Sequence, residues 1–186
     1  MQNVVMVPLT PTAVAEVMDR VGVWWAVAGG WAIDLWLGEQ TRDHHDIEVV
    51  IARADQSMVH AALREEWILR RIDPPGSDWR PWGGQPLTPP AFQLQAARGG
   101  NAFDLFAETV DGTTWTFRRD PRITRPVAEV VAISGSGIPV VRPEVQLLYM
   151  AKSGEPKHDH DRAVAMPALD EPAASWLAAA LRRHHS

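Results

Sequence analysis

The sequence AGGWAIDLWLGEQTRDHHDIEVV, residues 28–50, joins a glycine pair, a short apolar segment with helical spacing and an acid-rich segment in one uninterrupted run. The preceding residues, VWWAVA at 23–28, are rich in β-formers, and Gly38 is a natural end for a helix. The predicted order is therefore strand, glycine turn, short helix, and a second strand over residues 46–52. Two acids, Asp46 and Glu48, stand in that second strand.

These two acids predict a cation site. Side chains alternate across a strand, so Asp46 and Glu48 project to one face and Ile47 and Val49 to the other. Carboxylates about 6 to 7 Å apart along a strand repel one another, and a bound divalent cation would offset that repulsion. Oxygen ligands favour Mg²⁺ or Mn²⁺. The alternative is an edge strand whose charges face solvent and prevent aggregation.

Gly29 and Gly30 are predicted to lie between a strand and a helix. Without side chains, the backbone there can approach a ligand, and the N–H groups at the start of the helix can bind an anion. The spacing matches neither the P-loop nor the G-x-G-x-x-G pattern of dinucleotide-binding proteins. Together with the acids, the glycine pair predicts a phosphate-binding turn beside a metal site.

A third acid, Asp104, stands between Phe103 and Leu105 in a strand-like run. An isolated charge among apolar neighbours is costly unless it is hydrogen-bonded or metal-paired. If this strand pairs beside residues 46–50, Asp104 joins the same face as the other two acids. The alternative is a strand-end carboxylate paired with Arg98 or Arg118.

The rest of the chain predicts a mixed α and β core followed by helices. Thr10, Pro11 and Gly22 mark the start and end of a first helix. The soft boundary near Pro143 gives a core over 1–142 and a helical segment over 143–186, packed on it. Further elements are predicted at 55–67 (helix), 67–72, 91–97, 102–110, 113–119, 127–133 and 138–141 (strands), and 143–154, 157–169 and 171–186 (helices).

Residues 73–90 are rich in proline and glycine, which predicts a long surface loop within the domain over 1–142. Trp79 and Trp82 in this loop could form one wall of an acceptor site, or they could simply pack at the surface.

Composition limits the possible functions. The 186 residues, 46% of them hydrophobic, suffice for one core with a tail, and the absence of cysteine excludes disulfides, thiolate metal sites and cysteine nucleophiles. No apolar run reaches about 18 residues and the N-terminus lacks a basic region, so we expect no membrane span and a cytoplasmic protein. A net charge of -5 disfavours broad capture of nucleic acid and suits a small neutral or cationic substrate.

The run GGWAIDLWLGEQTRDHHDIEV, followed by FDLF, resembles the nucleotidyltransferase superfamily of DNA polymerase beta type. Within it, the run is similar to the small antibiotic nucleotidyltransferases that adenylylate aminoglycosides and lincosamides. The superfamily usually has serine where this chain has Trp31, and aspartate where it has Glu48; Trp31 agrees with the antibiotic subgroup. The positions that match the subgroup are Gly29, Gly30, Trp31, Asp34, Gly38, Arg42, His44, Asp46, Ile47, Glu48 and, as third acid, Asp104.

The resemblance implies an α+β fold, with a polymerase-beta-like mixed sheet flanked by helices and a C-terminal helical tail. It implies a metal-dependent enzyme that transfers a nucleoside monophosphate, AMP from ATP or another NTP, to a hydroxyl of a small molecule such as an aminoglycoside or lincosamide, and releases pyrophosphate. The implied catalytic and Mg²⁺- or Mn²⁺-binding residues are Asp46, Glu48 and Asp104, and the implied nucleotide-binding residues are Gly29, Gly30, Trp31, Arg42, His44 and Lys157.

Several alternatives stay open. Arg42 and His44 either contact phosphate or brace the turn, and His44 and His45 face opposite ways in a strand, which disfavours a shared zinc ion. In a helix His158 and Asp161 share a face and could be metal ligands; the alternatives are a solvated, self-paired helix start, or Lys157 reaching a phosphate. The acceptor could instead be tRNA or protein, as in toxin–antitoxin nucleotidyltransferases, or the chain could bind nucleotides without catalysis.

Overall fold

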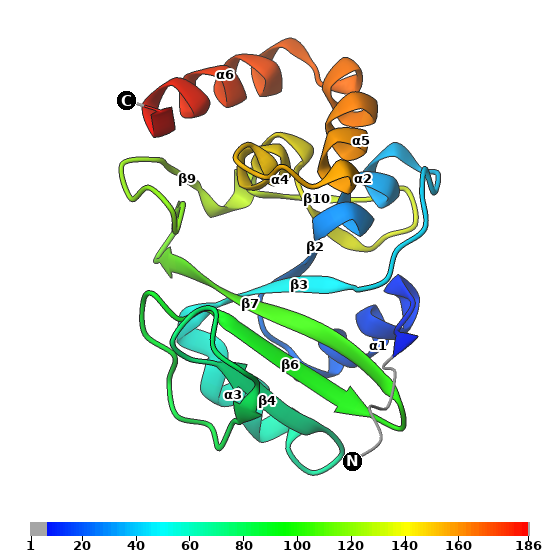
Figure 1. Cartoon of the computed structure of the whole chain (residues 1–186), viewed down its shortest axis with the longest axis vertical. Helices are drawn as coiled ribbons and strands as arrows, with labels where there is room; N and C mark the ends of the chain where they lie inside the picture. Colours follow the sequence, from blue (N-terminus) through cyan, green and yellow to red (C-terminus); the bar gives the residue numbers. More distant parts are fainter. Residues whose placement is uncertain (1–6, 186) are drawn as a thin grey trace. The chain divides into compact units, whose positions relative to one another are not determined.

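The computed structural model describes residues 7–185 and has the predicted α+β fold with a mixed sheet (Figure 1). The chain forms two compact units: unit 1 comprises residues up to Ala26 and His44–Thr109, and unit 2 comprises Val27–Asp43 and Val110–Ser186. The helical segment that follows Pro143 belongs to unit 2 together with residues 27–43 and 110–142. No helix within residues 7–185 has the length and apolarity needed to cross a membrane.

Unit 1 contains a sheet and two α-helices. Strand β2 (Trp25–Ala28) and strand β7 (Asn101–Asp111) each run across the division between the units. The other elements of unit 1 are β1 (Val7–Pro8), α1 (Pro11–Val21), β3 (Glu48–Ala52), η1 (Arg53–Asp55), α3 (Gln56–Leu63), β4 (Ile68–Ile72), β5 (Arg80–Pro81) and β6 (Gln93–Arg98).

Helix α1 has the ends that the sequence predicts. The Thr10 hydroxyl accepts a hydrogen bond from the backbone N–H of Ala13 at 3.2 Å, and Pro11 occupies the first turn. Gly22 ends the helix in the left-handed conformation, with a φ of 73°, and its N–H donates to the Met18 carbonyl.

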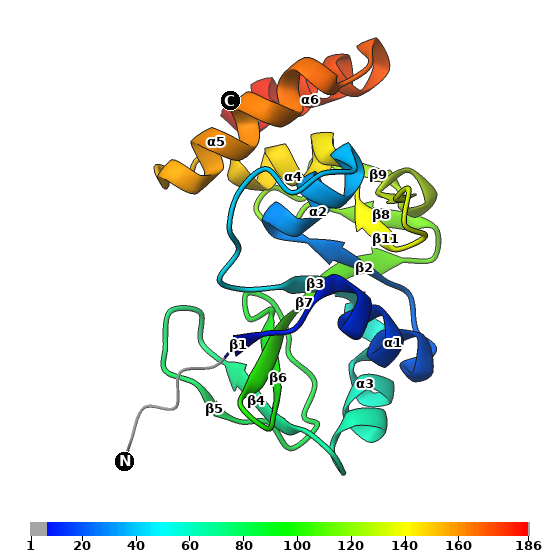
Figure 2. The ribbon, with the colours of Figure 1, turned by 90° about the vertical axis from the view of Figure 1, so that its right-hand side faces the viewer.

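The sheet of unit 1 has the strand order β3, β7, β6, β4, β5, and β1 pairs with β7. Strand β3 is parallel to β7, whereas β6 is antiparallel to both β7 and β4. Helices α1 and α3 lie side by side on one face of this sheet (Figure 2). The buried side chains of Phe103, Leu105 and Ala107 on β7 fit that covered face, so Asp104 and Phe106, which alternate with them, belong to the opposite face.

A tight hairpin turn joins β6 and β7. Gly99 and Gly100 have φ angles of 58° and 84°, which two-residue turns of this kind require and which glycine adopts without strain. This turn sets the register in which Gln95 stands opposite Asp104.

The long loop at 73–90 is anchored in unit 1. Trp82 and Leu87 are buried, and the Gln56 side chain both donates to the Leu87 carbonyl and accepts from its N–H. The Arg53 guanidinium donates to the carbonyls of Leu87, Ala91 and Ala107. Trp82 therefore packs in the core of unit 1 rather than at the surface.

Unit 2 is mainly helical. Helix α4 packs against α2, α5 and α6, and Figure 2 shows it between α2 and the two C-terminal helices. Strand β11 pairs antiparallel with β10 and parallel with β2, and β8 pairs with β9. The elements of unit 2 are α2 (Gly29–Leu37), β8 (Thr114–Thr116), β9 (Thr124–Pro126), η2 (Val127–Glu129), β10 (Val131–Ile133), β11 (Pro139–Val141), α4 (Pro143–Met150), α5 (Pro156–Ala165), η3 (Met166–Ala168) and α6 (Glu171–His185).

The three C-terminal helices are confirmed, but the strand predicted over 127–133 is only partly right. Residues Val127–Glu129 form a turn of 3₁₀-helix, and only Val131–Ile133 pair as a strand. A further short strand, β9, follows Ile123, where the sequence pattern indicated none.

Candidate active site

The predicted acids of unit 1 come from neighbouring strands. In the parallel pairing of β3 with β7, Glu48 is the direct partner of Asp104, and directly opposed residues of adjacent strands share one face of the sheet. The backbone N–H of Asp104 donates to the Ile47 carbonyl at 2.9 Å, which holds this end of the pairing closed. The prediction that the strand of Asp104 pairs beside that of Glu48 is confirmed.

Asp46 lies just before β3 rather than within it, because the strand begins at Glu48, two residues later than predicted. The alternation expected of a strand still holds for burial: Ile47 and Val49 are fully buried, Glu48 is half-buried and Asp46 is exposed. Asp46 and Glu48 therefore lie on the accessible side and the aliphatic residues on the core side.

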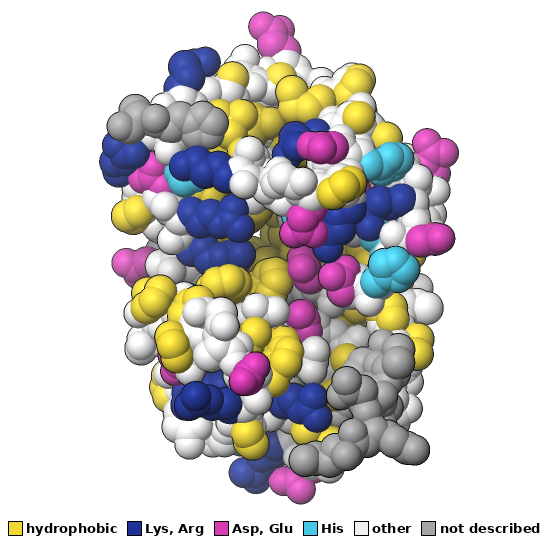
Figure 3. Space-filling model, viewed as in Figure 1, with side chains coloured by type: hydrophobic (Ala, Val, Ile, Leu, Met, Phe, Trp, Pro, Cys, Tyr) yellow, Lys and Arg dark blue, Asp and Glu magenta, His cyan; other side chains and the backbone are white. Residues whose placement is uncertain are grey.

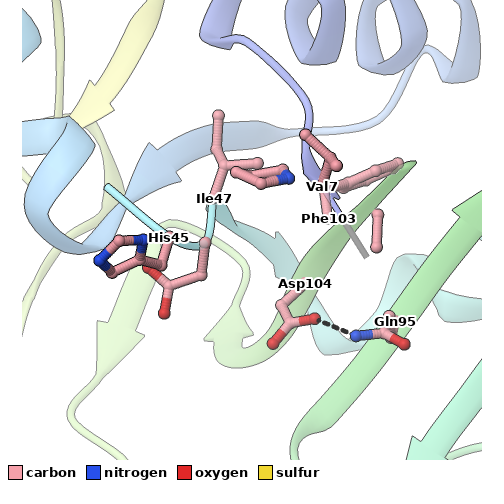
Figure 4. A pocket seen from close by; sticks show the side chains of 9 residues that line it. Val7, His45, Ile47, Gln95, Phe103 and Asp104 are labelled. Carbon is pink, nitrogen blue, oxygen red and sulfur yellow. Dashed lines mark hydrogen bonds between the residues drawn. The ribbon is translucent and has the colours of Figure 1, made fainter. Parts of the chain in front are cut away.

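Asp46 and Asp104 line one pocket of about 100 Å³ within unit 1. Gln95 and His45 contribute polar atoms to its lining, and the remaining wall is apolar. Figure 4 shows the Asp104 carboxylate facing the Gln95 side chain, with Ile47 and Phe103 nearby. The apolar lining comes from Val7, Pro8, Ile47, Ala102 and Phe103.

The Asp104 carboxylate is held by two amides. The Nε2 atom of Gln95 donates to Oδ1 at 3.0 Å, and that of Gln93 donates to Oδ2 at 3.2 Å. Burial raises the pKa of Asp104, the two amide hydrogen bonds lower it, and the charge of Asp46 raises it, with a net increase over the ordinary value. Of the arginines considered as partners, Arg98 pairs with Glu66, and Arg118 stacks on Tyr149.

The carboxylate oxygens of Asp46, Glu48 and Asp104 are ligands that suit Mg²⁺ or Mn²⁺ rather than a soft metal. Among residues 7–185, no three His, Asp or Glu side chains form a group that could hold a metal ion. Magnesium usually takes only one or two protein carboxylates and completes its shell with water and phosphate oxygens. Asp46 and Asp104 on one pocket, with Glu48 in register beside Asp104, fit that mode of binding.

In unit 2, Gly29 and Gly30 form the first turn of α2 itself, not a separate turn before it. Gly29 has a φ of 67°, a backbone conformation that residues other than glycine rarely adopt. Its N–H donates to Oε1 of Gln146 at 3.0 Å. One of the amides predicted to approach phosphate is thus engaged by a glutamine of α4.

Trp31 is half-buried on the same helix and lines a second pocket, of about 400 Å³, within unit 2. Leu35 extends the apolar wall, and Glu39, Gln40 and Ser136 add polar atoms. Asp34 also lines this pocket, but it is buried and its carboxylate accepts from both the N–H and the hydroxyl of Thr41.

Arg42 braces the chain. Its guanidinium makes a two-pronged ion pair with Asp161 of α5, at 2.7 and 2.9 Å, and donates to the Asp43 carbonyl at 3.0 Å. Asp161 is fully buried. It is therefore neither a solvated helix-start acid nor an accessible partner of His158.

Of the remaining candidates, His44 is half-buried at the start of the 44–109 segment of unit 1. Lys157, in the first turn of α5, forms an ion pair with Glu155, with 3.5 Å between its Nζ and Oε2 of the glutamate. His158 shares a hydrogen bond of 2.5 Å with the Ser153 hydroxyl, and burial lowers its pKa.

Gln93, Gln95 and Gln146 were missed by the sequence analysis. The signal for Gln93 and Gln95 was the alternation QLQ on a strand next to the strand of Asp104, because the two glutamines then lie on the same face as this acid. No local signal marks Gln146, because its partner Gly29 lies 117 residues away.

Residues 12–81 match the family model described as aminoglycoside-2''-adenylyltransferase, and the matched segment contains the glycine pair, Asp46 and Glu48. No curated protein matches the sequence of this chain.

Solved structures give a wider match at low identity. ANT(2'')-Ia in complex with adenylyl-2''-tobramycin is 17% identical, with a TM-score of 0.62 over 94% of this chain and 98% of that one. The solution structure of the antibiotic-resistance factor ANT(2'')-Ia is 16% identical, with a TM-score of 0.60 over 95% of each chain. The lincosamide antibiotic adenylyltransferase LnuA, bound to lincomycin, is 16% identical, with a TM-score of 0.57 over 81% and 90%. The chain thus has the nucleotidyltransferase fold, and the resemblance to antibiotic nucleotidyltransferases is confirmed.

Proposed function

We propose that this chain is a metal-dependent nucleotidyltransferase that joins AMP from ATP, or another NMP from its triphosphate, to a hydroxyl of a small antibiotic-like molecule. Pyrophosphate is the second product. The observation that carries the proposal is that Glu48 and Asp104 are direct partners on paired strands of a nucleotidyltransferase fold, with Asp46 just before β3 on the pocket that Asp104 also lines.

Asp46 and Glu48 are the proposed ligands of Mg²⁺ or Mn²⁺, and Asp104 lies across the strand pairing from Glu48. A divalent ion bound there supplies charge neutralisation for the triphosphate. The carboxylates would hold and orient the ion at the pocket that Asp46 and Asp104 line.

Asp104 is suited to receive a proton, because its burial raises the carboxyl pKa toward that of a useful general base. In the proposed reaction the acceptor oxygen forms a bond to the α-phosphorus, and the bond from this phosphorus to pyrophosphate breaks. The hydroxyl proton passes to the Asp104 carboxylate and then to solvent. Asp104 could instead hold a second metal ion, in which case solvent takes the proton directly.

A small acceptor suits the surface better than nucleic acid does. The chain carries a net charge of -5, and in each unit the face in Figure 3 mixes Lys and Arg with Asp and Glu side chains. The net negative charge disfavours broad capture of polyanions and favours polycationic acceptors such as aminoglycosides.

The proposal is tested by incubating the full chain with Mg²⁺, each of four α-labelled nucleoside triphosphates, and aminoglycosides, lincosamides or bulk tRNA. We expect label to transfer to an antibiotic, most efficiently from ATP. Transfer only to tRNA would replace the small-molecule acceptor with a nucleic acid. Nucleotide binding by calorimetry without transfer to any acceptor would support a non-catalytic nucleotide-binding module and contradict the proposal.

A further inference from the structure

Two glutamines of β6 contact the Asp104 carboxylate, and each takes a different oxygen. Gln95 donates to Oδ1 at 3.0 Å, and Gln93 donates to Oδ2 at 3.2 Å. Gln95 is the direct partner of Asp104 in the antiparallel pairing, and Gln93 stands two residues further along the same face. The two donors therefore reach the carboxylate from one strand.

A carboxylate held at both oxygens cannot rotate without breaking a hydrogen bond. It has about four lone-pair sites, and two neutral donors leave the others available to a further ligand. Asp104 and Gln95 both line the pocket that Asp46 also lines. The contacts thus fix the Asp104 side chain at the wall of that pocket.

The chemical type of the donor matters. An arginine in place of either glutamine would pair with the carboxylate as an ion and would compete with a cation for it. An amide donates a hydrogen bond but carries no net charge, so the negative charge of the Asp104 carboxylate is not neutralised. The nearest arginine on this strand, Arg98, is engaged elsewhere with Glu66 and with the Trp67 ring.

We propose that Gln93 and Gln95 are positioning residues that preset the orientation of the Asp104 carboxylate for the metal and the acceptor. This inference rests on the proposed function. Strand β6 thus contributes to the site through the contacts of its two glutamines with Asp104.

The test compares Gln95→Met and Gln93→Met with the wild type. Methionine keeps the length of the side chain and removes the amide. The matched control is Gln85→Met, in unit 1, because the Gln85 amide oxygen accepts from the N–H of Gly83 and this residue lies outside β6. Mn²⁺ binding is measured by calorimetry with a non-reactive methylene analogue of ATP present, and kcat and KM are measured on an accepted antibiotic.

We expect Gln95→Met to weaken Mn²⁺ binding and to lower kcat by about tenfold or more, with little change in the KM of the acceptor. Gln93→Met should have a smaller effect, and Gln85→Met none. Loss of Mn²⁺ affinity is the readout that a purely structural role would not give in a variant with wild-type thermal stability.

Unchanged Mn²⁺ affinity and kcat in both β6 variants would overturn the positioning role while leaving the proposed function intact. Absence of Mn²⁺ binding and of transfer in the wild type would instead overturn the proposed function. If Gln95→Met does not fold, Gln95→Asn, which keeps an amide too short to reach Asp104, is measured in its place with the same expected loss.

Discussion

Asp46, Glu48 and Asp104 carry the same functional group in different surroundings. Asp46 is exposed, Glu48 is half-buried, and Asp104 is desolvated and held by two amides. Because the groups differ in burial, we expect them to differ in the effect of substitution.

The first prediction concerns pH. Burial raises the pKa of Asp104, so its ionised, proton-accepting form is gained at a higher pH than for an ordinary aspartate. Activity measured as kcat/KM should therefore rise as pH rises through this raised pKa. The amides lower the pKa, so Gln95→Met should move the rising limb to still higher pH. A limb that stays in place, or moves to lower pH, would contradict this role of Asp104.

The second prediction concerns Glu48, which stands where the superfamily most often has aspartate. Glutamate also binds magnesium, so Glu48→Asp should keep turnover within about thirtyfold of wild type, equivalent to about 2 kcal/mol in the barrier. Its main effect should be on the Mg²⁺ concentration needed for half-maximal rate. Glu48→Gln, which removes the charge at equal length, should lose far more activity; equal activity of the two variants would show that the charge is not used.

Single residues were predictable where their chemistry conflicts with their position. Acids in apolar strands are such a conflict, and Asp46, Glu48 and Asp104 were found that way. Gln93 and Gln95 cause no conflict, because an amide on a half-buried strand face is ordinary; only the register of β6 against β7 shows what they contact.

At the scale of secondary structure elements, the ion pair of Arg42 with Asp161 joins the segment after α2 to helix α5. The segment also bonds to α5 where Nε2 of His160 lies 3.2 Å from the Thr41 hydroxyl. Sequence placed both residues of the ion pair among functional candidates, and their structural role emerged only from a contact across 119 residues.

The third prediction follows from the burial of Asp161. Arg42→Met leaves a fully buried carboxylate without its charged partner, which should lower the free energy of unfolding by about 3 to 5 kcal/mol. The loss is measured by denaturant unfolding. Adding Asp161→Leu should recover most of it, because the uncompensated charge is then gone. A double variant no more stable than Arg42→Met alone would contradict this explanation.

Elements were predicted accurately where local signals fix both ends. Thr10, Pro11 and Gly22 act within a few residues of one another, and α1 begins and ends as they indicate. Helix α2 begins at Gly29, which has a positive φ and donates its N–H to Gln146. A turn before the helix was the simpler local prediction, but it could not include that distant contact.

At the scale of the whole molecule, the sequence run that resembles antibiotic nucleotidyltransferases is divided between the two units. Its glycine pair and Arg42 belong to unit 2, whereas His44, Asp46 and Glu48 belong to unit 1. Composition suggested a division near Pro143, because the helical character begins there. In the structure, the helices that follow Pro143 belong to unit 2 with residues 27–43 and 110–142.

The central claim is that acids from two paired strands hold the metal at which nucleotide transfer occurs. The most direct measurement is pyrophosphate release by Asp46→Asn on the accepted nucleotide and antibiotic, at saturating Mg²⁺. The matched control is Asp43→Asn, the same change at an exposed acid three residues earlier. The account predicts that Asp46→Asn keeps the melting temperature of the wild type and loses nearly all pyrophosphate release, while Asp43→Asn keeps it. Turnover by Asp46→Asn near the wild-type rate would contradict the claim.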